Sequence, residues 1–306
     1  MSHVSKNTGY FESFDGTKLY YEERGKGSPL VLCYGIGCLF NHWRPQINHF
    51  AKTHRVIVFD YRAHHKSESP KEDHFTLEYF AHDINALMKH LKLEKATFFG
   101  HSFGAQVLVK AYDLFPNYFE RIIFINGFVK NPIKGMFGGD LSEKGFYFIK
   151  KWYQLLPETM TYIWKFLTDN PVAIPLSGLA GGFNLMLTQY KDIEIYARAI
   201  SSLDLEAFLK IFEQMMEYDG TPVLNRIDVP CLLIAGAKDA VTPVRHQNEM
   251  HDSIKNSEIT IMPYGSHCTQ LDLPDYVNIR IEKFLNDTSS QKKRSDIKSD
   301  LNSPIG

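Results

Sequence analysis

The stretch Gly100-His101-Ser102-Phe103-Gly104 decides the fold of this chain. It follows a short apolar run at 96–99 that is typical of a buried strand, and it precedes a helical pattern over 105–115. The turn between strand and helix leaves no room for side chains at the flanking glycine positions, and it lifts the serine hydroxyl away from the backbone. The five-residue pattern alone occurs by chance in many chains. Its place between a strand and a helix predicts that Ser102 is a nucleophile.

Short apolar runs without alternation recur along the chain, as expected for strands that are buried on both faces of a parallel sheet. They lie at 30–34, 56–59, 98–99, 122–125, 231–235 and 259–262. The segment 9–24 instead predicts a hairpin with Asp15-Gly16 at its turn. A one-sided apolar pattern over 76–91 predicts a helix, and Thr242-Pro243 has the residue types of a helix start. These patterns predict an α/β fold, with a mostly parallel eight-stranded sheet begun by an antiparallel hairpin and helices on both faces.

Residues 128–202 interrupt this alternation, because they contain no strand-like run between turns and are rich in aromatic helical pieces. We expect a helical lid here, inserted after the sixth strand. It separates the two parts of the core, residues 1–127 and 203–286. The last segment, 287–306, is polar with few apolar side chains, and we expect a disordered tail.

The composition excludes several classes of protein. Of the 306 residues, 44% are hydrophobic and 23% charged, and the net charge of −1 gives no reason to expect a nucleic-acid partner. The start of the chain lacks the apolar region of a signal peptide, and no apolar run reaches the roughly 18–20 residues of a membrane span. The four cysteines lack the spacing of a zinc site or disulfide framework. We expect a cytoplasmic protein without a metal or cofactor, of undetermined oligomeric state.

A serine hydroxyl needs a base, and the base needs a group that orients it. Position selects among the 13 histidines: His267 comes directly after the last apolar run, at the sheet edge where loops carry chemistry. Asp239 follows the preceding strand in the same way. Ser102, Asp239 and His267 occur along the chain in the order nucleophile, acid and base, which is the order found in hydrolases whose serine lies on such a strand-to-helix turn.

Through these three residues and their positions, the segment 9–286 resembles the α/β-hydrolase family. Within the family it is most similar to esterases and lipases that have a helical lid. The resemblance implies that Ser102 attacks, His267 moves the proton and Asp239 orients the imidazole. The family's His-Gly-x-Gly loop corresponds to Tyr34-Gly35-Ile36-Gly37. By that match, the backbone N–H groups of Ile36 and Phe103 would form the oxyanion hole.

Two segments depart from the family pattern. Tyr34 replaces the usual histidine, so we expect the loop to be supported differently. The segment 60–67 resembles the family's Asp-x-Arg-Gly-His-Gly-x-Ser motif with both glycines replaced, and we expect His65 to face solvent. Ser102 stands where haloalkane dehalogenases and epoxide hydrolases of the family have aspartate, which argues against both activities.

The substrate is predicted from the lid. Its aromatic side chains suit an apolar pocket, for which Trp152, Trp164 and Phe128 are the candidate residues. We expect a small hydrophobic ester, as in a monoacylglycerol lipase or lysophospholipase. Two alternatives stay open: a carbon–carbon bond hydrolase of the meta-cleavage type, with Arg44 or Lys238 binding a carboxylate, and a ligand receptor with little turnover. Lys150-Lys151 beside lid aromatics also allow peripheral membrane contact, although the chain carries no predicted integral segment.

Overall fold

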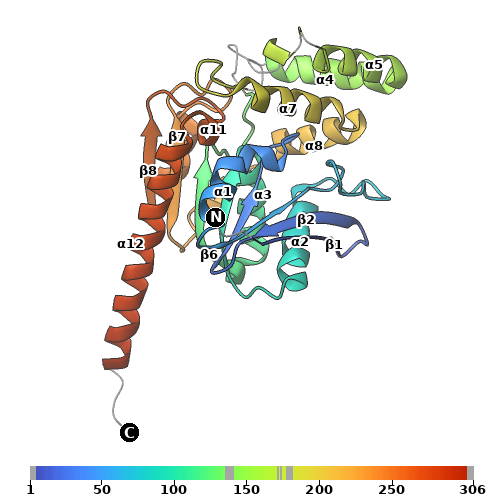
Figure 1. The fold of residues 1–306 in the computed structure, drawn as a ribbon. Helices are drawn as coiled ribbons and strands as arrows, with labels where there is room; N and C mark the ends of the chain where they lie inside the picture. Colours follow the sequence, from blue (N-terminus) through green and yellow to red (C-terminus); the bar gives the residue numbers. More distant parts are fainter. Residues whose placement is uncertain (1–4, 135–140, 171, 173, 177–181, 302–306) are drawn as a thin grey trace.

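The computed structural model describes residues 5–134, 141–170, 172, 174–176 and 182–301, with side chains as far as residue 290 (Figure 1). The strands are β1 (Lys6–Glu12), β2 (Lys18–Arg24), β3 (Pro29–Cys33), β4 (Arg55–Phe59), β5 (Ala96–His101), β6 (Phe119–Ile125), β7 (Cys231–Gly236) and β8 (Ser257–Met262). They form one eight-stranded sheet in the order β1-β2-β4-β3-β5-β6-β7-β8. The pairs β1–β2 and β2–β4 are antiparallel, and every later pair is parallel. The predicted sheet and its opening hairpin are confirmed.

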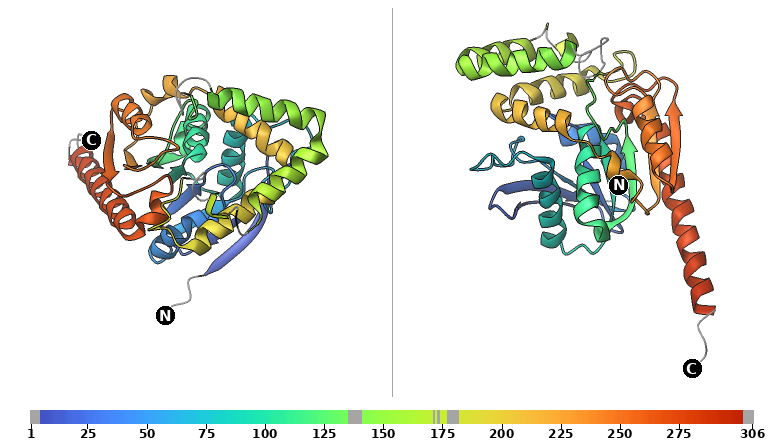
Figure 2. Two further views of the ribbon diagram at one scale, coloured as in Figure 1. Left: turned by 90° about the horizontal axis from the view of Figure 1, so that it is seen from above. Right: turned by 180° about the vertical axis from the view of Figure 1, so that it is seen from behind.

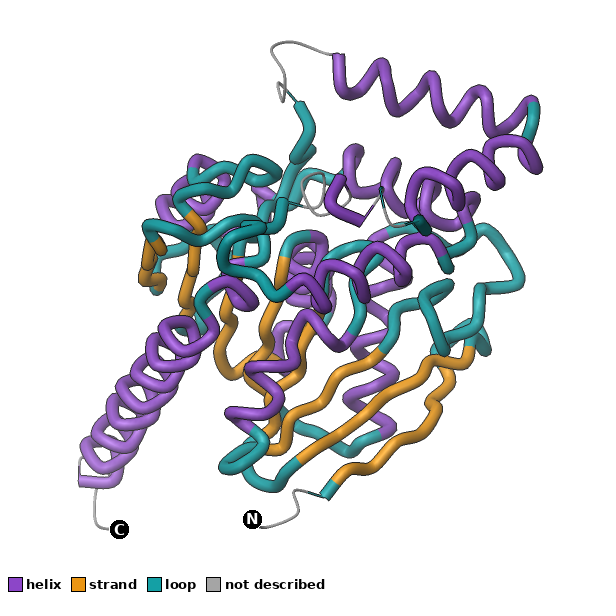
Figure 3. The backbone as a smooth tube through the Cα atoms, turned by 45° about the horizontal axis from the view of Figure 1, so that its top comes forward, coloured by secondary structure: helices purple, strands orange, loops and turns teal. Residues whose placement is uncertain are grey.

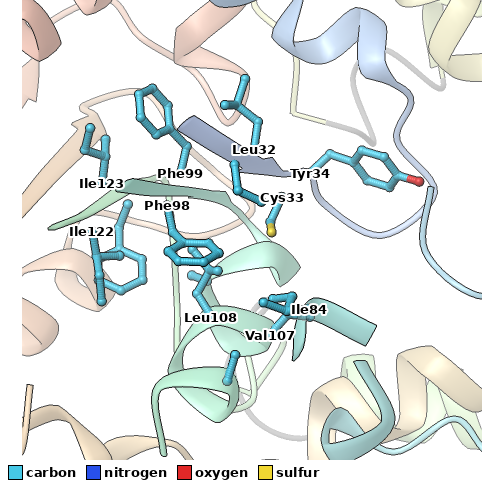
Figure 4. Close-up of a cluster of buried hydrophobic side chains, with 14 of the residues drawn as sticks. Leu32, Cys33, Tyr34, Ile84, Phe98, Phe99, Val107, Leu108, Ile122 and Ile123 are labelled. Carbon is cyan, nitrogen blue, oxygen red and sulfur yellow. The ribbon is translucent and has the colours of Figure 1, made fainter. Parts of the chain in front are cut away.

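The centre of the sheet is buried on both faces, as the uninterrupted apolar runs predict. All six residues of β5 are buried. Figure 4 shows Phe98 and Phe99 on opposite faces of β5, with Phe98 directed toward Leu108 of the following helix. This burial holds the strand that carries the elbow sequence in a fixed position, because neither face of it is open to water.

Helices lie on both faces of the sheet and beyond the carboxyl ends of its strands. They are α1 (Arg44–Phe50), α2 (Leu77–His90), α3 (Phe103–Leu114), α4 (Leu141–Leu155), α5 (Pro157–Thr168), α7 (Tyr190–Ser201), α8 (Leu205–Glu217), α9 (Thr221–Leu224), α10 (Arg245–Ser253), α11 (Thr269–Asp272) and α12 (Pro274–Leu301), with short 3₁₀ turns η1 (Phe40–Trp43) and η2 (Pro116–Tyr118). Helices α1 and α12 pack together on one face, and α2 packs against α3 on the other (Figure 2).

Helices α4, α5 and α7 belong to the segment predicted as a lid, and they lie beyond the carboxyl ends of the parallel strands (Figures 1 and 3). Helix α8 lies between them and the core and has an apolar face toward each. Its Leu205 and Leu209 cluster with Phe146 of α4, whereas Ala207 and Ile211 join the main core. The helix that follows the predicted lid therefore forms the floor on which the lid rests.

The carboxyl-terminal segment differs from the expected disordered tail. Helix α12 continues to Leu301, and residues 302–306 lie outside the described part of the chain. Arg121 of β6 fixes this helix, since its Nε lies 2.6 Å from the hydroxyl of Thr288 and its Nη2 lies 2.9 Å from that of Ser289. Neither α12 nor any other helix of the described ranges is long and apolar enough to cross a membrane.

A buried ion pair fixes the loop after β4. Arg62 is fully buried, with Nε and Nη2 at 2.8 and 2.5 Å from the carboxylate of Asp83 in α2. Its Nη1 donates to Asp15 and to the His74 carbonyl, both at 2.9 Å. The guanidinium therefore links the first hairpin, the loop and α2.

Replacing Asp83 with alanine should lower the free energy of unfolding by about 3–5 kcal/mol, because Arg62 would stay buried with its charge only partly compensated. Urea denaturation measures this loss. The control is Glu249→Ala, which removes an exposed 2.7 Å pair with Lys130 and should change stability by less than about 1 kcal/mol. Equal losses in the two variants would contradict the prediction.

Candidate active site

The structure brings Ser102, His267 and Asp239 together at the carboxyl ends of β5, β8 and β7. The Ser102 hydroxyl lies 2.9 Å from His267 Nε2, and His267 Nδ1 lies 2.9 Å from Asp239 Oδ2. A carboxylate can only accept, so Nδ1 carries the proton and Nε2 is free to accept from the serine. All three side chains are buried.

Ser102 has φ +54° and ψ −123°, a backbone conformation that side-chain-bearing residues rarely adopt. It links the end of β5 directly to the first turn of α3. Gly104 permits this close turn, because a Cβ there would lie 2.4 Å from the Cys33 carbonyl oxygen. The hydroxyl consequently projects from a sharp turn, as the elbow sequence predicts.

Asp239 is held by four hydrogen bonds. Its Oδ1 accepts from the backbone N–H groups of Val241 and Thr242 at 2.8 and 2.7 Å, and its Oδ2 accepts from the Thr242 hydroxyl at 2.7 Å and from His267. Thr242 is therefore a partner of the acid, whereas the sequence predicted a helix start at Thr242-Pro243. Helix α10 begins only at Arg245.

Asn126 was not predicted from the sequence, and it joins the two loops that carry the acid and the base. It follows β6, is fully buried and has φ +47°. Its amide nitrogen donates to the carbonyls of Ser266 and His267 at 2.7 and 2.6 Å, and its oxygen accepts from Gly236 N at 2.7 Å. The signal available in the sequence was a polar residue at the end of a buried apolar run, directly before Gly127.

The two residues assigned to the oxyanion hole border the serine. Phe103 is the first residue of α3, so its N–H has no acceptor within the helix. Ile36 lines the cavity that contains Ser102, and a Cβ on neighbouring Gly35 would lie 3.0 Å from the Ser102 Cβ. Both backbone segments are therefore close to the position where an oxyanion would develop.

Tyr34 supports this loop through its phenol. The Tyr34 hydroxyl donates to Asp60 Oδ1 at 3.1 Å and accepts from Tyr61 N at 3.1 Å. Burial raises the pKa of Asp60 to about 7, although the N–H of Lys66 and the Tyr34 hydroxyl act in the opposite direction. A contact between the Tyr34 phenol and the Asp60 carboxyl group therefore supports the loop in place of the family's histidine.

Two histidines from the loop after β4 complete the support. Gly37 N donates to His64 Nε2 at 3.2 Å, and His65 Nε2 donates to the Cys38 carbonyl at 2.8 Å. The expectation that His65 faces solvent is wrong, because its ring is committed to this carbonyl and half-buried. Burial lowers the pKa of His64 to about 3, which keeps Nε2 free to accept.

A cavity of about 270 Å³ adjoins the triad. It is lined by Ser102, His267, Ile36 and Phe128, together with apolar side chains of α7 and α8. A second cavity of about 610 Å³ lies between α4, α5 and α8, and its walls are almost entirely apolar. Ile133, Phe208 and Phe212 line both cavities.

The three residues predicted to line the substrate pocket lie in three different places in the structure. Phe128 lines the cavity beside Ser102, and Trp164 lines the second cavity, where its Nε1 donates to the Ile200 carbonyl at 3.3 Å. Trp152 is 41% exposed and lies near Phe148, with ring centroids 6.0 Å apart, away from both cavities. The prediction for Trp152 is therefore wrong, because its position on α4 directs it outward.

The segment before α7, which the sequence assigns to a lid, also contacts the loop that carries His267. Gly182 accepts a hydrogen bond from His267 N at 2.9 Å and has φ +71°. A Cβ at this position would lie 2.6 Å from the Cβ of His267. Only glycine fits between the lid and the histidine, so the lid backbone helps to position the base.

Among the described residues, no group of three or more His, Cys, Asp or Glu side chains is arranged to hold a metal ion.

Comparison with known proteins places this geometry in a family. One family model, described as alpha/beta hydrolase fold, matches residues 28–158, and a second, described as TAP-like protein, matches 214–296. The chain belongs to the α/β-hydrolase fold family. Family and relatives support a hydrolase activity.

The relatives and solved structures have varied names. Epoxide hydrolase 4 of Mus musculus is 25% identical over 286 residues, covering 88% of this chain and 77% of that protein. 3-oxoadipate enol-lactonase 2 of Acinetobacter baylyi is 24% identical over 261 residues, covering 84% and 88%. An esterase from Exiguobacterium antarcticum has the same fold, with a TM-score of 0.71, 20% identity and coverage of 90% and 98%.

The contribution of two buried histidines to the stability of the fold should be lost in acid. Burial lowers the pKa of His64 to about 3 and that of His42 to about 4, whereas an unfolded histidine titrates near 6.5. The unfolded chain therefore binds more protons below pH 6.5, so this contribution is complete above that pH and is lost progressively as the pH falls. Urea denaturation between pH 7 and 5 measures the slope.

His64→Gln should flatten that slope, because the amide oxygen can still accept from Gly37 N but does not titrate. The control is His90→Gln, at an exposed position on α2. An unchanged slope in the His64 variant would show that this ring is not held neutral by the fold.

Proposed function

We propose that the protein is a serine hydrolase that cleaves a hydrophobic carboxylic ester. The observation that carries this proposal is the continuous hydrogen-bonded path from Ser102 Oγ through His267 to Asp239 beside an apolar cavity. A nucleophile, a base within hydrogen-bond reach and a group that orients the base are the parts that acyl transfer requires.

The proposed reaction has two halves. Ser102 attacks the ester carbonyl while His267 Nε2 takes its proton, and the N–H groups of Ile36 and Phe103 stabilise the oxyanion. His267 then gives this proton to the leaving alcohol, and the acyl group stays on Ser102 as an acyl-enzyme. Water then attacks, His267 takes its proton, and the acid is released as Ser102 is reprotonated. Ester and water supply every atom of the acid and alcohol, so no cofactor is needed.

The second cavity supports a hydrophobic substrate. Its walls come from apolar side chains of α4, α5 and α8, and it shares Phe208 and Phe212 with the cavity at Ser102. An acyl chain or hydrophobic alcohol that starts at the serine would pass these phenyl rings and enter this space. Each buried methylene would contribute roughly 0.8 kcal/mol. Lipid esters such as monoacylglycerols or lysophospholipids fit this arrangement.

The carbon–carbon hydrolase alternative lacks support at the carboxylate-binding position. The cavity at Ser102 has no lysine or arginine among its described lining residues. Arg44 is paired with Asp192 at 2.8 Å, and Lys238 is exposed to solvent. The similarity to an epoxide hydrolase does not carry over either, because Ser102 occupies the elbow where those enzymes have aspartate. The enol-lactonase relative acts on a cyclic ester by its name, which agrees with acyl transfer.

Ser102→Ala should lower kcat for nitrophenyl esters by about a thousandfold or more, because the remaining site cannot form the acyl-enzyme. An unchanged melting temperature would show that the variant is folded. Full esterase activity in the variant would contradict the mechanism. Turnover of a dienoate without turnover of esters would support the carbon–carbon alternative, and ligand binding without turnover would support a receptor.

Filling the second cavity should shorten the preferred chain. Ile163 of α5 lines this cavity, so Ile163→Trp should lower kcat/KM for long-chain nitrophenyl esters by about tenfold while short esters stay unaffected. The matched control is Tyr162→Trp, one residue away and 72% exposed. An equal loss for short and long esters would show that the chain does not enter this cavity.

A further inference from the structure

Helix α4 has two apolar faces. One points inward, where the Phe146 ring packs on Phe212 of α8 with centroids 5.1 Å apart. The other carries Leu141, Phe148, Trp152 and Leu155, which are 66%, 63%, 41% and 61% exposed. Their spacing of seven, four and three residues places them in one stripe along the helix. This stripe lies opposite the packed face and has no cover within the described chain.

Helix α5 extends the same surface. Tyr162 and Phe166 are 72% and 63% exposed, one turn apart, while Met160 and Trp164 of the same helix face the second cavity. Figures 1 and 2 show α4 and α5 as the outermost layer of the molecule, at the end opposite the carboxyl terminus. The outer lid face comprises Leu141, Phe148, Trp152, Leu155, Tyr162 and Phe166.

Basic side chains border this surface. Lys144 and Lys151 follow Leu141 and Phe148 by three residues and lie to one side of the α4 stripe, and Lys165 lies to one side of Tyr162 and Phe166 on α5. All three are exposed, and none forms an ion pair with another described residue. Glu158 is the exposed acidic residue of the two helices. The outer lid face is thus aromatic and apolar with a mainly positive border.

This combination favours a lipid surface over a second copy of the chain. Phenylalanine, tryptophan and leucine on one side of a helix, with lysine beside them, is the pattern of helices that lie in the membrane interface. Anionic headgroups attract each nearby lysine. A symmetric dimer through the same face would instead bring the lysines of both copies together, with Glu158 as the nearby acid on each side.

We propose that the outer lid face docks on the surface of an anionic phospholipid membrane. The inner sides of the same helices wall the second cavity, which shares Phe208 and Phe212 with the cavity at Ser102. A lipid ester at the docked surface would therefore have a short apolar path to the serine. This path rests on the proposed function, whereas docking itself is a binding property that does not depend on turnover.

Vesicle cosedimentation tests docking on the full chain. The vesicles contain phosphatidylcholine alone or mixed with phosphatidylglycerol, at low and high salt. We expect the protein to sediment with the mixed vesicles and to be partly released by salt. Phe148→Ser with Leu155→Ser should weaken partitioning about tenfold or more, since two apolar side chains would no longer insert. Lys144→Glu with Lys151→Glu should weaken binding to the mixed vesicles about tenfold and leave phosphatidylcholine binding unchanged.

A matched control removes apolar surface elsewhere. Tyr276→Ser with Ile279→Ser changes two α12 side chains that are 68% and 63% exposed, and it should not alter sedimentation. Thermal unfolding checks that each variant is folded. The proposal is overturned if wild type does not sediment with vesicles, or if the control weakens binding as much as the lid variants.

Sedimentation velocity without lipid tests whether a second copy of the chain, instead of a membrane, covers the outer lid face. A dimer that Phe148→Ser with Leu155→Ser dissociates, together with absent vesicle binding, would assign the outer lid face to a second copy and overturn the proposal. Vesicle binding by Ser102→Ala equal to that of wild type would support docking whether or not the protein hydrolyses esters. The two proposals therefore fail independently.

Discussion

The left-handed backbone of Ser102 is the constraint on which the rest of the site depends. A side-chain-bearing residue in such a conformation costs about 1–3 kcal/mol, and it persists only when surrounding structure imposes it. Here β5 is paired on both sides, with β3 and β6, and every residue of it is buried. Helix α3 starts immediately afterwards, and Gly104 lets it approach the Cys33 carbonyl. The centre of the sheet therefore fixes the serine hydroxyl, and the other two members of the triad must come to it.

Asn126 explains how two separate loops reach the serine with consistent geometry. The acid loop starts at Gly236 and the histidine loop passes through Ser266, and both hydrogen-bond to this one side chain. His101 adds a second restraint, because its Nε2 lies 2.8 Å from the His267 carbonyl. Burial keeps the pKa of His101 well below its usual value, so the ring stays neutral beside His267. Neutral donors thus hold the base without adding positive charge next to it.

The sheet, the elbow and the order of the triad could be predicted because each leaves a local pattern in the sequence. Buried parallel strands need uninterrupted apolar runs, and the elbow needs glycine where space is absent. The roles of Asn126 and Thr242 could not be predicted, since both depend on loops brought together from separate parts of the chain. The ordered start of the expected tail depends on Arg121, more than 160 residues earlier. Long-range hydrogen bonds of this kind have no sequence periodicity.

The orientation of α4 is a further feature that could not be predicted from the sequence, and it bears on function. Helix α4 carries apolar residues on two faces, so its sequence pattern alone does not tell which face packs inward. The aromatic content of the lid segment predicted Trp152 in the pocket, whereas the structure puts Phe146 inside and Trp152 outside. An uncovered apolar stripe gains less from folding than a buried one, because much of its surface stays in contact with water. Any surface that covers the stripe would also contact the helices that wall the second cavity.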